Sequence, residues 1–191
     1  LSGWDGSVPL VDPCCGSGIL LIEAALMALQ QAPGLGRNFG LEGWADFQPE
    51  LWQEECDRAQ KRRRGDLNLP PLLGIEQDPL VAEQARINTA AAGLEGVIEI
   101  REGSFTEHDL PDGPGVLVCN PPYGQRIGEE EELDHLYSAL GGYVRQQASG
   151  WQLWLLSGNP KLTGGLRMKA SRRIPISNGG IDCRWLHYSI R

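Results

Sequence analysis

The chain has 191 residues, of which 41% are hydrophobic and 22% charged, enough for one domain with a full-sized core. It has no charge-poor stretch long enough to cross a membrane. No secretory signal is visible, but the start of the sequence looks cut and is not read for targeting. The net charge of −8 argues against a protein that binds nucleic acid unaided.

Five cysteines, at positions 14, 15, 56, 119 and 183, include no Cys-x-x-Cys pair and have no histidine at ligand spacing. This odd number favours a reduced, cytoplasmic protein over a disulfide scaffold or a zinc site, and we expect no bound metal. We interpret Cys14 and Cys15 as small residues packed in a tight turn.

Residues 61–64, Lys-Arg-Arg-Arg, form a concentrated positive stretch next to Arg58. The favoured interpretation is the solvated last turn of a helix, where cations oppose the helix dipole. The alternative is an RNA-contacting patch.

In chain order, apolar runs bounded by turn residues predict alternating strands and helices. Residues 8–12 are predicted to form a strand, 17–31 a buried helix that is apolar nearly all round, and 33–47 a loop rich in glycine and aromatic residues. Pro49 opens a polar helix to about Arg64. The next predicted elements are a strand at 72–76, a helix at 79–92 closed by Gly93, strands at 97–101 and 115–119, an amphipathic helix at 129–147 and a strand at 151–157.

The C-terminal part differs, because residues 166–176 and 182–190 alternate around a Ser-Asn-Gly-Gly turn at 177–180, the pattern of an antiparallel hairpin. Strands alternating with helices, closed by such a hairpin, predict an α/β fold with a doubly wound sheet. We expect a single domain over residues 1–191, with 33–70 as an insertion of a length that is often functional. A buried strand so close to Leu1 indicates a domain cut from a longer chain.

The sequence Asn120-Pro121-Pro122-Tyr123 directly follows a predicted strand and indicates methylation of a planar nitrogen. The lone pair of a nucleobase amine or a carboxamide is delocalised, so two acceptors aimed at its N–H bonds would favour the tetrahedral geometry that attack requires. Asn120 offers a side-chain carbonyl and Pro121 a backbone carbonyl, and Pro121 biases Asn120 toward an extended backbone. Tyr123 offers a flat face for stacking. The alternative is a strand followed by an ordinary Pro-Pro turn.

A second candidate element is the turn at residues 12–18, between the first strand and the first helix. Ligands of open parallel sheets bind beyond the carboxyl ends of the strands, where this turn lies. Gly16 and Gly18 let the backbone approach a ligand, and the following helix N-terminus favours a carboxylate. Asp12 is suited to hold a cationic amine.

Two further strand ends complete the set. Glu76 ends the second strand and is suited to accept both ribose hydroxyls of a nucleoside, the alternative being an ordinary loop carboxylate. Ser104 and Phe105 follow the third strand and offer an adenine a polar group and an apolar face. Together with Asn120 after the fourth strand, these residues predict an adenosyl cofactor that carries an amino acid, S-adenosylmethionine.

Three motifs resemble those of class I methyltransferases that methylate amino groups: Asp-Pro-x-Cys-Gly-Ser-Gly at 12–18, Ile-Glu-Ala-Ala at 22–25 and Asn-Pro-Pro-Tyr-Gly at 120–124. Further blocks, at 32–35, 43–44 with 51–52, and 178–183, are similar to the UPF0020-type methyltransferase domain of bacterial 23S rRNA guanine-N2 methyltransferases. The resemblance covers essentially the whole chain.

The resemblance implies a class I, Rossmann-like fold, S-adenosylmethionine as cofactor and a guanine of 23S rRNA as substrate. It implies that Asp12, Gly16 and Gly18 contact the cofactor, that Glu76 contacts its ribose, and that the guanine is contacted by Asn120, Pro121, Pro122 and Tyr123. With the strand-end candidates added, the predicted cofactor-binding residues are Asp12, Cys14, Gly16, Gly18, Glu76, Ser104, Phe105 and Asn120. It also implies an upstream THUMP domain and, in the fusions of gammaproteobacteria, a second methyltransferase downstream. RNA recognition would then lie partly outside this acidic chain.

The chain departs from the family pattern at a few positions. Ser104 stands where Asp is usual, which makes a backbone contact to adenine the alternative there, and Glu76 replaces the commoner Asp. Gln125 stands where Glu often precedes Arg126, and Ile19 replaces a usual Thr. None of these changes removes the core chemistry.

The substrate stays open on the residues alone. The Asn-Pro-Pro-Tyr sequence serves equally for adenine N6 in DNA or RNA and for glutamine in a release factor, and a non-catalytic cofactor-binding module is a further alternative. Within the insertion, Arg37, Trp44 and residues 61–64 are candidates for an RNA-facing rim.

Overall fold

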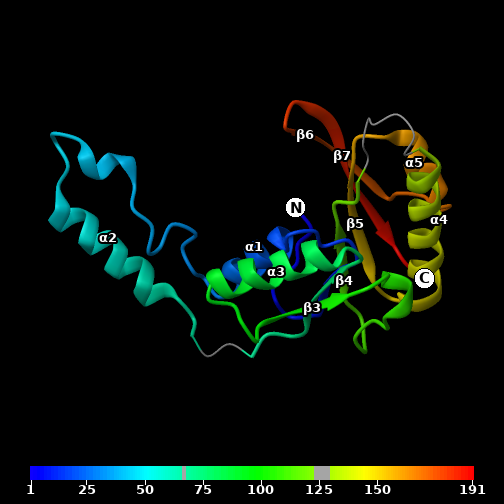
Figure 1. Cartoon of the computed structure of the whole chain (residues 1–191), viewed down its shortest axis with the longest axis horizontal. Helices are drawn as coiled ribbons and strands as arrows, with labels where there is room; N and C mark the ends of the chain where they lie inside the picture. The colour runs from blue at the N-terminus through cyan, green and yellow to red at the C-terminus, as the bar shows by residue number, and fades with distance from the viewer. Residues whose placement is uncertain (66–67, 123–129) are drawn as a thin grey trace.

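One mixed sheet organises the computed structural model, which describes residues 1–65, 68–122 and 130–191. Its strands have the order β3-β2-β1-β4-β5-β7-β6, and β1 to β5 are parallel while β7 and β6 run antiparallel (Figure 1). The strands are β1 Leu10–Asp12, β2 Leu72–Glu76, β3 Ile98–Glu102, β4 Val116–Cys119, β5 Gln152–Ser157, β6 Arg172–Asn178 and β7 Ile181–Ser189.

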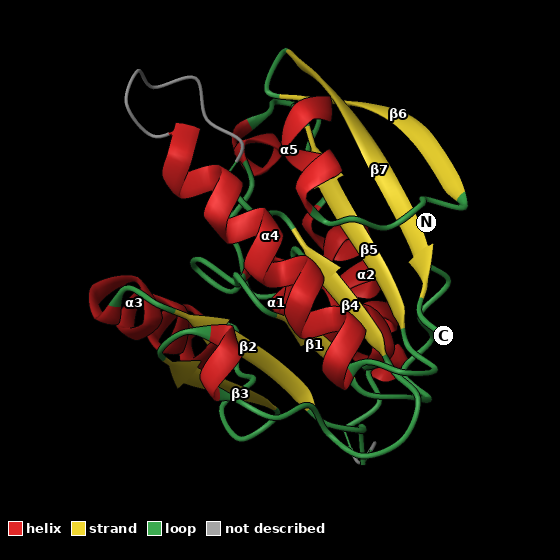
Figure 2. Cartoon of the chain, turned by 90° about the vertical axis from the view of Figure 1, so that its right-hand side faces the viewer, coloured by secondary structure: helices red, strands yellow, loops and turns green. Residues whose placement is uncertain are grey.

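The described helices are α1 Ile19–Ala28, α2 Pro49–Arg62, α3 Pro79–Ala91, α4 Glu130–Gln147 and α5 Pro160–Gly165, with short 3₁₀ turns η1 Gly40–Gly43 and η2 Phe105–Glu107. All of these helices except α2 flank the sheet, on both of its faces. In Figures 1 and 2, α1 and α3 lie on one side of the sheet, and α4 and α5 on the other. The predicted doubly wound α/β sheet is therefore confirmed.

The central strands form because their sequences are continuous apolar runs. Every residue of β1 and β4 is buried, as are the first four of β2, which is the burial expected where helices cover both faces. One hydrophobic cluster includes Leu133, Tyr137 and Leu140 of α4, and a second, on the opposite face, includes Leu21 and Ala25 of α1.

Two helices, α2 and α3, start at the prolines from which the sequence predicts them. Asp78 caps α3 by accepting a hydrogen bond from the backbone N–H of Leu80 at 2.8 Å, and Pro79 occupies the first helical position. Pro49 likewise begins α2. Helix α1 is less buried than its composition predicts, because Ile19 and Met27 are 62% and 74% exposed.

The C-terminal hairpin is present, but its boundaries differ from the prediction. Asn178 pairs with Ile181, so the turn contains only Gly179 and Gly180. The first strand begins at Arg172 instead of position 166, because the preceding residues belong to the unpredicted helix α5 and its exit. Asn159 starts this short helix by accepting a hydrogen bond from the N–H of Lys161 at 3.0 Å.

The 33–65 part of the predicted insertion forms an arm that projects from the domain beyond α1 and α3 (Figure 1). No residue of α2 is buried. The arm is held together by an edge-to-face contact between Phe39 and Trp52, with ring centroids 5.5 Å apart, and at its base by a 2.8 Å hydrogen bond from Arg64 N–H to Leu29 O. Within the described residues, no helix has the length and hydropathy needed to span a bilayer.

Substitutions at two adjacent glycines of α4, Gly141 and Gly142, can test how closely this helix packs on the segment after α5. A Cβ at Gly141 would lie 2.7 Å from Leu166 Cα and meet Leu166 O, whereas a Cβ at Gly142 meets nothing within 4 Å. We expect Gly141→Ala to lower the free energy of unfolding by about 1–3 kcal/mol through overpacking, as measured by urea denaturation. Gly142→Ala is the matched control and should raise stability by about 0.5–1 kcal/mol through helix propensity. Equal effects of the two substitutions would contradict the close packing at Gly141.

Candidate functional site

The carboxyl ends of β1, β2 and β4 meet at one edge of the sheet. Strand β1 lies between the other two, with Asp12 level with Gly74 of β2 and Val11 level with Leu117 of β4. Since β2 ends at Glu76 and Asn120 directly follows β4, residues far apart in sequence come to one edge. This is the switch point at which open α/β sheets bind ligands.

Asp12 is a buried carboxylate with a weak set of partners. It is 1% exposed, and the hydrogen bond that it accepts among the described residues comes from Cys14 N–H at 3.1 Å. Burial raises the pKa of Asp12 to about 7, the Cys14 N–H opposes this rise, and the nearby charge of Glu76 adds to it. A cation beside Asp12 would relieve this penalty.

The turn after Asp12 depends on glycine. Gly16 and Gly18 have φ values of 55° and 83°, in the left-handed region that other residues rarely adopt, and Gly18 precedes α1 without a side-chain cap. Asn88 of α3 fixes this turn from outside by donating its Nδ2–H to Ser17 O at 2.9 Å. The first N–H groups of α1 therefore have no side-chain cap at the strand edge.

Glu76 joins two of the strand-end loops. One carboxylate oxygen accepts a hydrogen bond from Gly16 N–H at 2.9 Å and the other accepts one from Asp78 N–H at 3.0 Å. These bonds fix the direction of the carboxylate, and each oxygen keeps a further lone pair for a hydroxyl donor.

Ser104 and Phe105 begin η2 and have structural contacts of their own. The Ser104 hydroxyl accepts a hydrogen bond from Thr106 N–H at 3.3 Å, and the ring of Phe105, 6% exposed, packs against Tyr143 with centroids 5.4 Å apart. The predicted stacking face is thus turned largely into the core. A ligand contact at these two residues stays a prediction.

Asn120 is exposed, Pro121 buried and Pro122 exposed directly after β4. Cys119 ends this strand fully buried, and burial, with a smaller contribution from nearby Cys14 in the turn after β1, places the pKa of Cys119 well above its usual value. Tyr123, Gln125 and Arg126 lie outside the described residues, so the predicted stacking by Tyr123 is untested.

All five cysteines are free, and Cys15 is buried in the tight turn that the sequence predicts. Across residues 1–65, 68–122 and 130–191, no group of three His, Cys, Asp or Glu side chains is placed to hold a metal ion.

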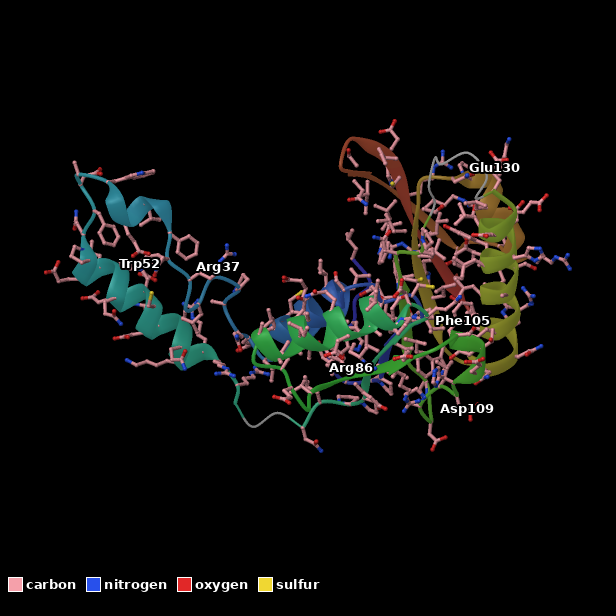
Figure 3. The ribbon with its side chains drawn as sticks, viewed as in Figure 1. Arg37, Trp52, Arg86, Phe105, Asp109 and Glu130 are labelled. Atoms are coloured by element: carbon pink, nitrogen blue, oxygen red, sulfur yellow. The ribbon has the colours of Figure 1, made fainter. Side chains whose placement is uncertain are left out.

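The insertion candidates lie on the arm, away from the strand edge. Figure 3 shows Arg37 and Trp52 on the arm and Phe105 in the body of the domain. Lys61 and Arg62 are exposed in the last turn of α2, which confirms the helix-terminal interpretation of these two cations. An RNA contact by the arm stays a prediction.

A family model described as "UPF0020: RMKL-like, methyltransferase domain" matches residues 1–187. The chain belongs to this family. The family that the sequence motifs indicated is therefore confirmed.

Curated relatives share the whole of this methyltransferase domain. The "Putative RNA methyltransferase slr0064" of Synechocystis is 38% identical over 191 residues, which are 100% of this chain and 50% of that protein. The "Ribosomal RNA large subunit methyltransferase K/L" of Vibrio campbellii is 42% identical over 193 residues, 98% of this chain and 27% of that protein. The chain thus spans half or less of the length of these relatives.

Solved structures agree with the fold. The crystal structure of SMU.472 in complex with SAH has a TM-score of 0.92 and 28% identity, covering 100% of this chain and 50% of that one. The structure of "a predicted N6-adenine-specific DNA methylase" from Listeria monocytogenes has a TM-score of 0.90 and 29% identity, with 100% and 49% covered. These matches confirm the class I, Rossmann-like fold of the methyltransferase domain.

Sequence reasoning missed Asn88 and Asn159. Asn88 positions the glycine turn from 71 residues away, and Asn159 starts α5 beside the end of β5. No local pattern marks Asn88, because its partner is a backbone carbonyl brought near by the packing of α3. An Asn-Pro pair, as at 159–160, is a recognisable helix start.

The raised pKa of Asp12 predicts a specific pH dependence of stability. Its folded-state pKa of about 7 exceeds the usual 3.8, so the folded state binds more protons between about pH 4 and pH 7 and the free energy of unfolding falls as the pH rises. Asp12→Asn keeps an acceptor for Cys14 N–H and removes this penalty. Without cofactor, we expect the free energy of unfolding of the variant to equal that of the parent near pH 4. At pH 8 it should exceed the parent's by at most about 4 kcal/mol, because each pKa unit corresponds to about 1.36 kcal/mol.

The measurement is urea denaturation at a series of pH values. Glu23→Gln, in the helix that follows the turn, serves as the control for the loss of one carboxylate. Parallel stability curves for Asp12→Asn and the parent would show that Asp12 is not the titrating group.

Proposed function

We propose that this domain transfers a methyl group from S-adenosylmethionine to the exocyclic N2 of a guanine in 23S rRNA. The observation that carries the proposal is that Asn120-Pro121 follows β4 beside the turn that holds Asp12, in a chain of a methyltransferase family. The acceptors for an amine and the candidate cofactor residues therefore share one strand edge.

The residues present fit this cofactor. Asp12 is a buried carboxylate without a cationic partner among the described residues, and it suits the ammonium of the methionine part. Gly16 and Gly18 allow close backbone approach, and the uncapped N-terminus of α1 suits the carboxylate. Glu76, oriented by two backbone N–H groups, suits the ribose hydroxyls. Cys14, Ser104 and Phe105 are proposed as flanking contacts.

When bound, S-adenosylmethionine supplies an electrophilic methyl group. The chain's part is to prepare the nitrogen that receives it. Asn120 Oδ1 and Pro121 O would accept the two N–H bonds of the guanine amine, which localises its lone pair and stabilises the positive charge that develops there. Pro122 would stiffen the turn, and Tyr123 would stack on the base after it leaves its helix or loop.

No general base is needed before transfer. The nitrogen becomes strongly acidic once it is alkylated, so its proton can pass to water afterwards. Position and charge stabilisation thus provide the rate enhancement, and they require the amine to be held in line with the donated methyl.

The choice of substrate rests on relatives. The Vibrio relative, 42% identical, bears the name of a ribosomal RNA methyltransferase, and this supports an RNA substrate. The name given to the Listeria protein favours adenine N6 as a second candidate, because the same pair of acceptors would serve that amine.

The relatives are at least twice as long as the segment that matches, which supports a longer protein in which residues 1–191 are one methyltransferase domain. We expect a THUMP domain upstream to supply RNA affinity, with a second methyltransferase downstream in fused versions. The net charge of −8 supports such a division of labour.

The mechanism predicts that Asn120→Ala separates cofactor binding from catalysis. Cofactor affinity, measured by calorimetry, should stay nearly unchanged, while methyl transfer falls by about 100-fold or more, the usual loss for one preorganised polar group in the transition state. Asn68→Ala removes an exposed asparagine before β2 and should behave like the parent. Equal turnover of Asn120→Ala and the parent would refute the proposed role of Asn120.

A second prediction concerns the isolated chain. It should bind S-adenosylmethionine but methylate unmodified 23S rRNA poorly, and a longer protein that includes the upstream region should restore activity. Mass spectrometry of the digested nucleosides identifies the product. N2-methylguanine would support the proposal, N6-methyladenine would support the second candidate, and binding without transfer in both proteins would indicate a non-catalytic module.

A further inference from the structure

Charge is segregated strongly along this acidic chain. Residues 160–191 contain seven Lys or Arg and one Asp, a net charge of +6. Because the whole chain has a net charge of −8, residues 1–159 carry a net charge of −14. The seven cations are Lys161, Arg167, Lys169, Arg172, Arg173, Arg184 and Arg191. Lys161 lies in α5, Arg167 and Lys169 in the segment after it, Arg172, Arg173 and Arg184 in the β6–β7 hairpin, and Arg191 after β7.

These cations are exposed and have no ionic partners in the part of the chain that the structure describes. All seven are exposed, and the ion pairs among the described residues involve only Arg58, Arg86 and Arg101, none of them in this region. Concentrated like charge destabilises the folded state unless an anion neutralises it. The region is therefore suited to a polyanion.

A groove of about 790 Å³ lies between α5 and one face of the hairpin. Arg173 and Arg184 line it. Arg184 pairs with Pro175, which is two residues from Arg173 on the same strand. Because paired residues and residues two apart in a strand point to the same face, Arg173 and Arg184 share one face of the hairpin. Asp182 lines the groove as well, but within the described residues it forms no ion pair with either arginine. Figure 2 shows α5 beside the hairpin at one end of the sheet.

The groove starts at the proposed reaction edge. Ser157, at the end of β5, and Asn159 line it. The last pair between the parallel strands β4 and β5 is Cys119 with Leu155. Asn120 follows Cys119 by one residue and Ser157 follows Leu155 by two, so the two residues lie close to the same end of adjacent strands. A polymer with one residue at Asn120 can therefore continue directly into the groove.

We propose that this groove holds the sugar–phosphate backbone next to the nucleotide that is methylated, with Arg173 and Arg184 contacting phosphates. The inference rests on the proposed function and adds a substrate-positioning surface within the domain itself. Phosphate contacts give register without reading sequence, which suits a domain whose partner regions provide specificity. The rest of the chain carries a net charge of −14, so apart from the positive stretch at 58–64 on the arm, its surface repels a polyanion and leaves the groove as the favoured track.

The test measures RNA binding as a function of salt. Unmodified 23S rRNA made by transcription in vitro is titrated with the full chain and with the double variant Arg173→Gln/Arg184→Gln. We expect the variant to bind about tenfold more weakly at 0.1 M salt and to lose about 1.4 from the slope of log affinity against log salt, about 0.7 for each phosphate contact to a single strand. S-adenosylmethionine binding should be unchanged.

The matched control is Arg86→Gln/Arg101→Gln, which removes two positive charges that already pair with Glu83 and Glu99 outside this region. If both double variants lose RNA affinity equally, the effect is one of net charge and the proposal is overturned. The proposal is also overturned if Arg173→Gln/Arg184→Gln binds RNA with the same affinity as the parent.

The two proposals fail separately. If the parent binds RNA through these arginines but neither it nor the longer protein with the upstream region makes N2-methylguanine, the proposed function is wrong and the groove stands. If methylation proceeds and the double variant has the KM of the parent, the groove is wrong and the function stands.

Discussion

The parallel pairing of β1 with both β2 and β4 is the constraint on which the rest of the structure depends. This strand has only three residues, yet it brings the ends of two distant strands to its own end. Asp12, Glu76 and Asn120 share one edge for this reason.

Backbone contacts then tie the edge together. Glu76 accepts hydrogen bonds from Gly16 and Asp78, so one carboxylate orders the turn after β1 and the start of α3 at the same time. Asn88 supports the turn from α3. The site is thus preorganised by main-chain groups, and its ordering does not require a long flexible side chain.

Electrostatics divides the domain into two parts with different tasks. At the strand edge, Asp12 carries a burial penalty that a cation would relieve, so its geometry suits a positively charged cofactor. In residues 160–191, Arg173 and Arg184, which form no ion pair in the described part of the chain, line a groove that continues from that edge. An acidic domain can in this way present a positive groove beside the strand edge, where the proposed RNA would pass.

The amino-acid sequence determined the alternation of strands and helices, the helix starts at Pro49 and Pro79, and the residue types at each strand end. These features depend on apolar periodicity and on helix-start residues, which are patterns of neighbouring residues. The motifs also identified the family. The short helix α5 and the exact hairpin turn escaped prediction, since six residues hold little periodic signal. Three outcomes needed the folded chain: Phe105 turns into the core, Asn88 supports the glycine turn, and Arg173 and Arg184 line one groove beside Asn120. They depend on strand order and on packing between segments far apart in the chain, which no local pattern records.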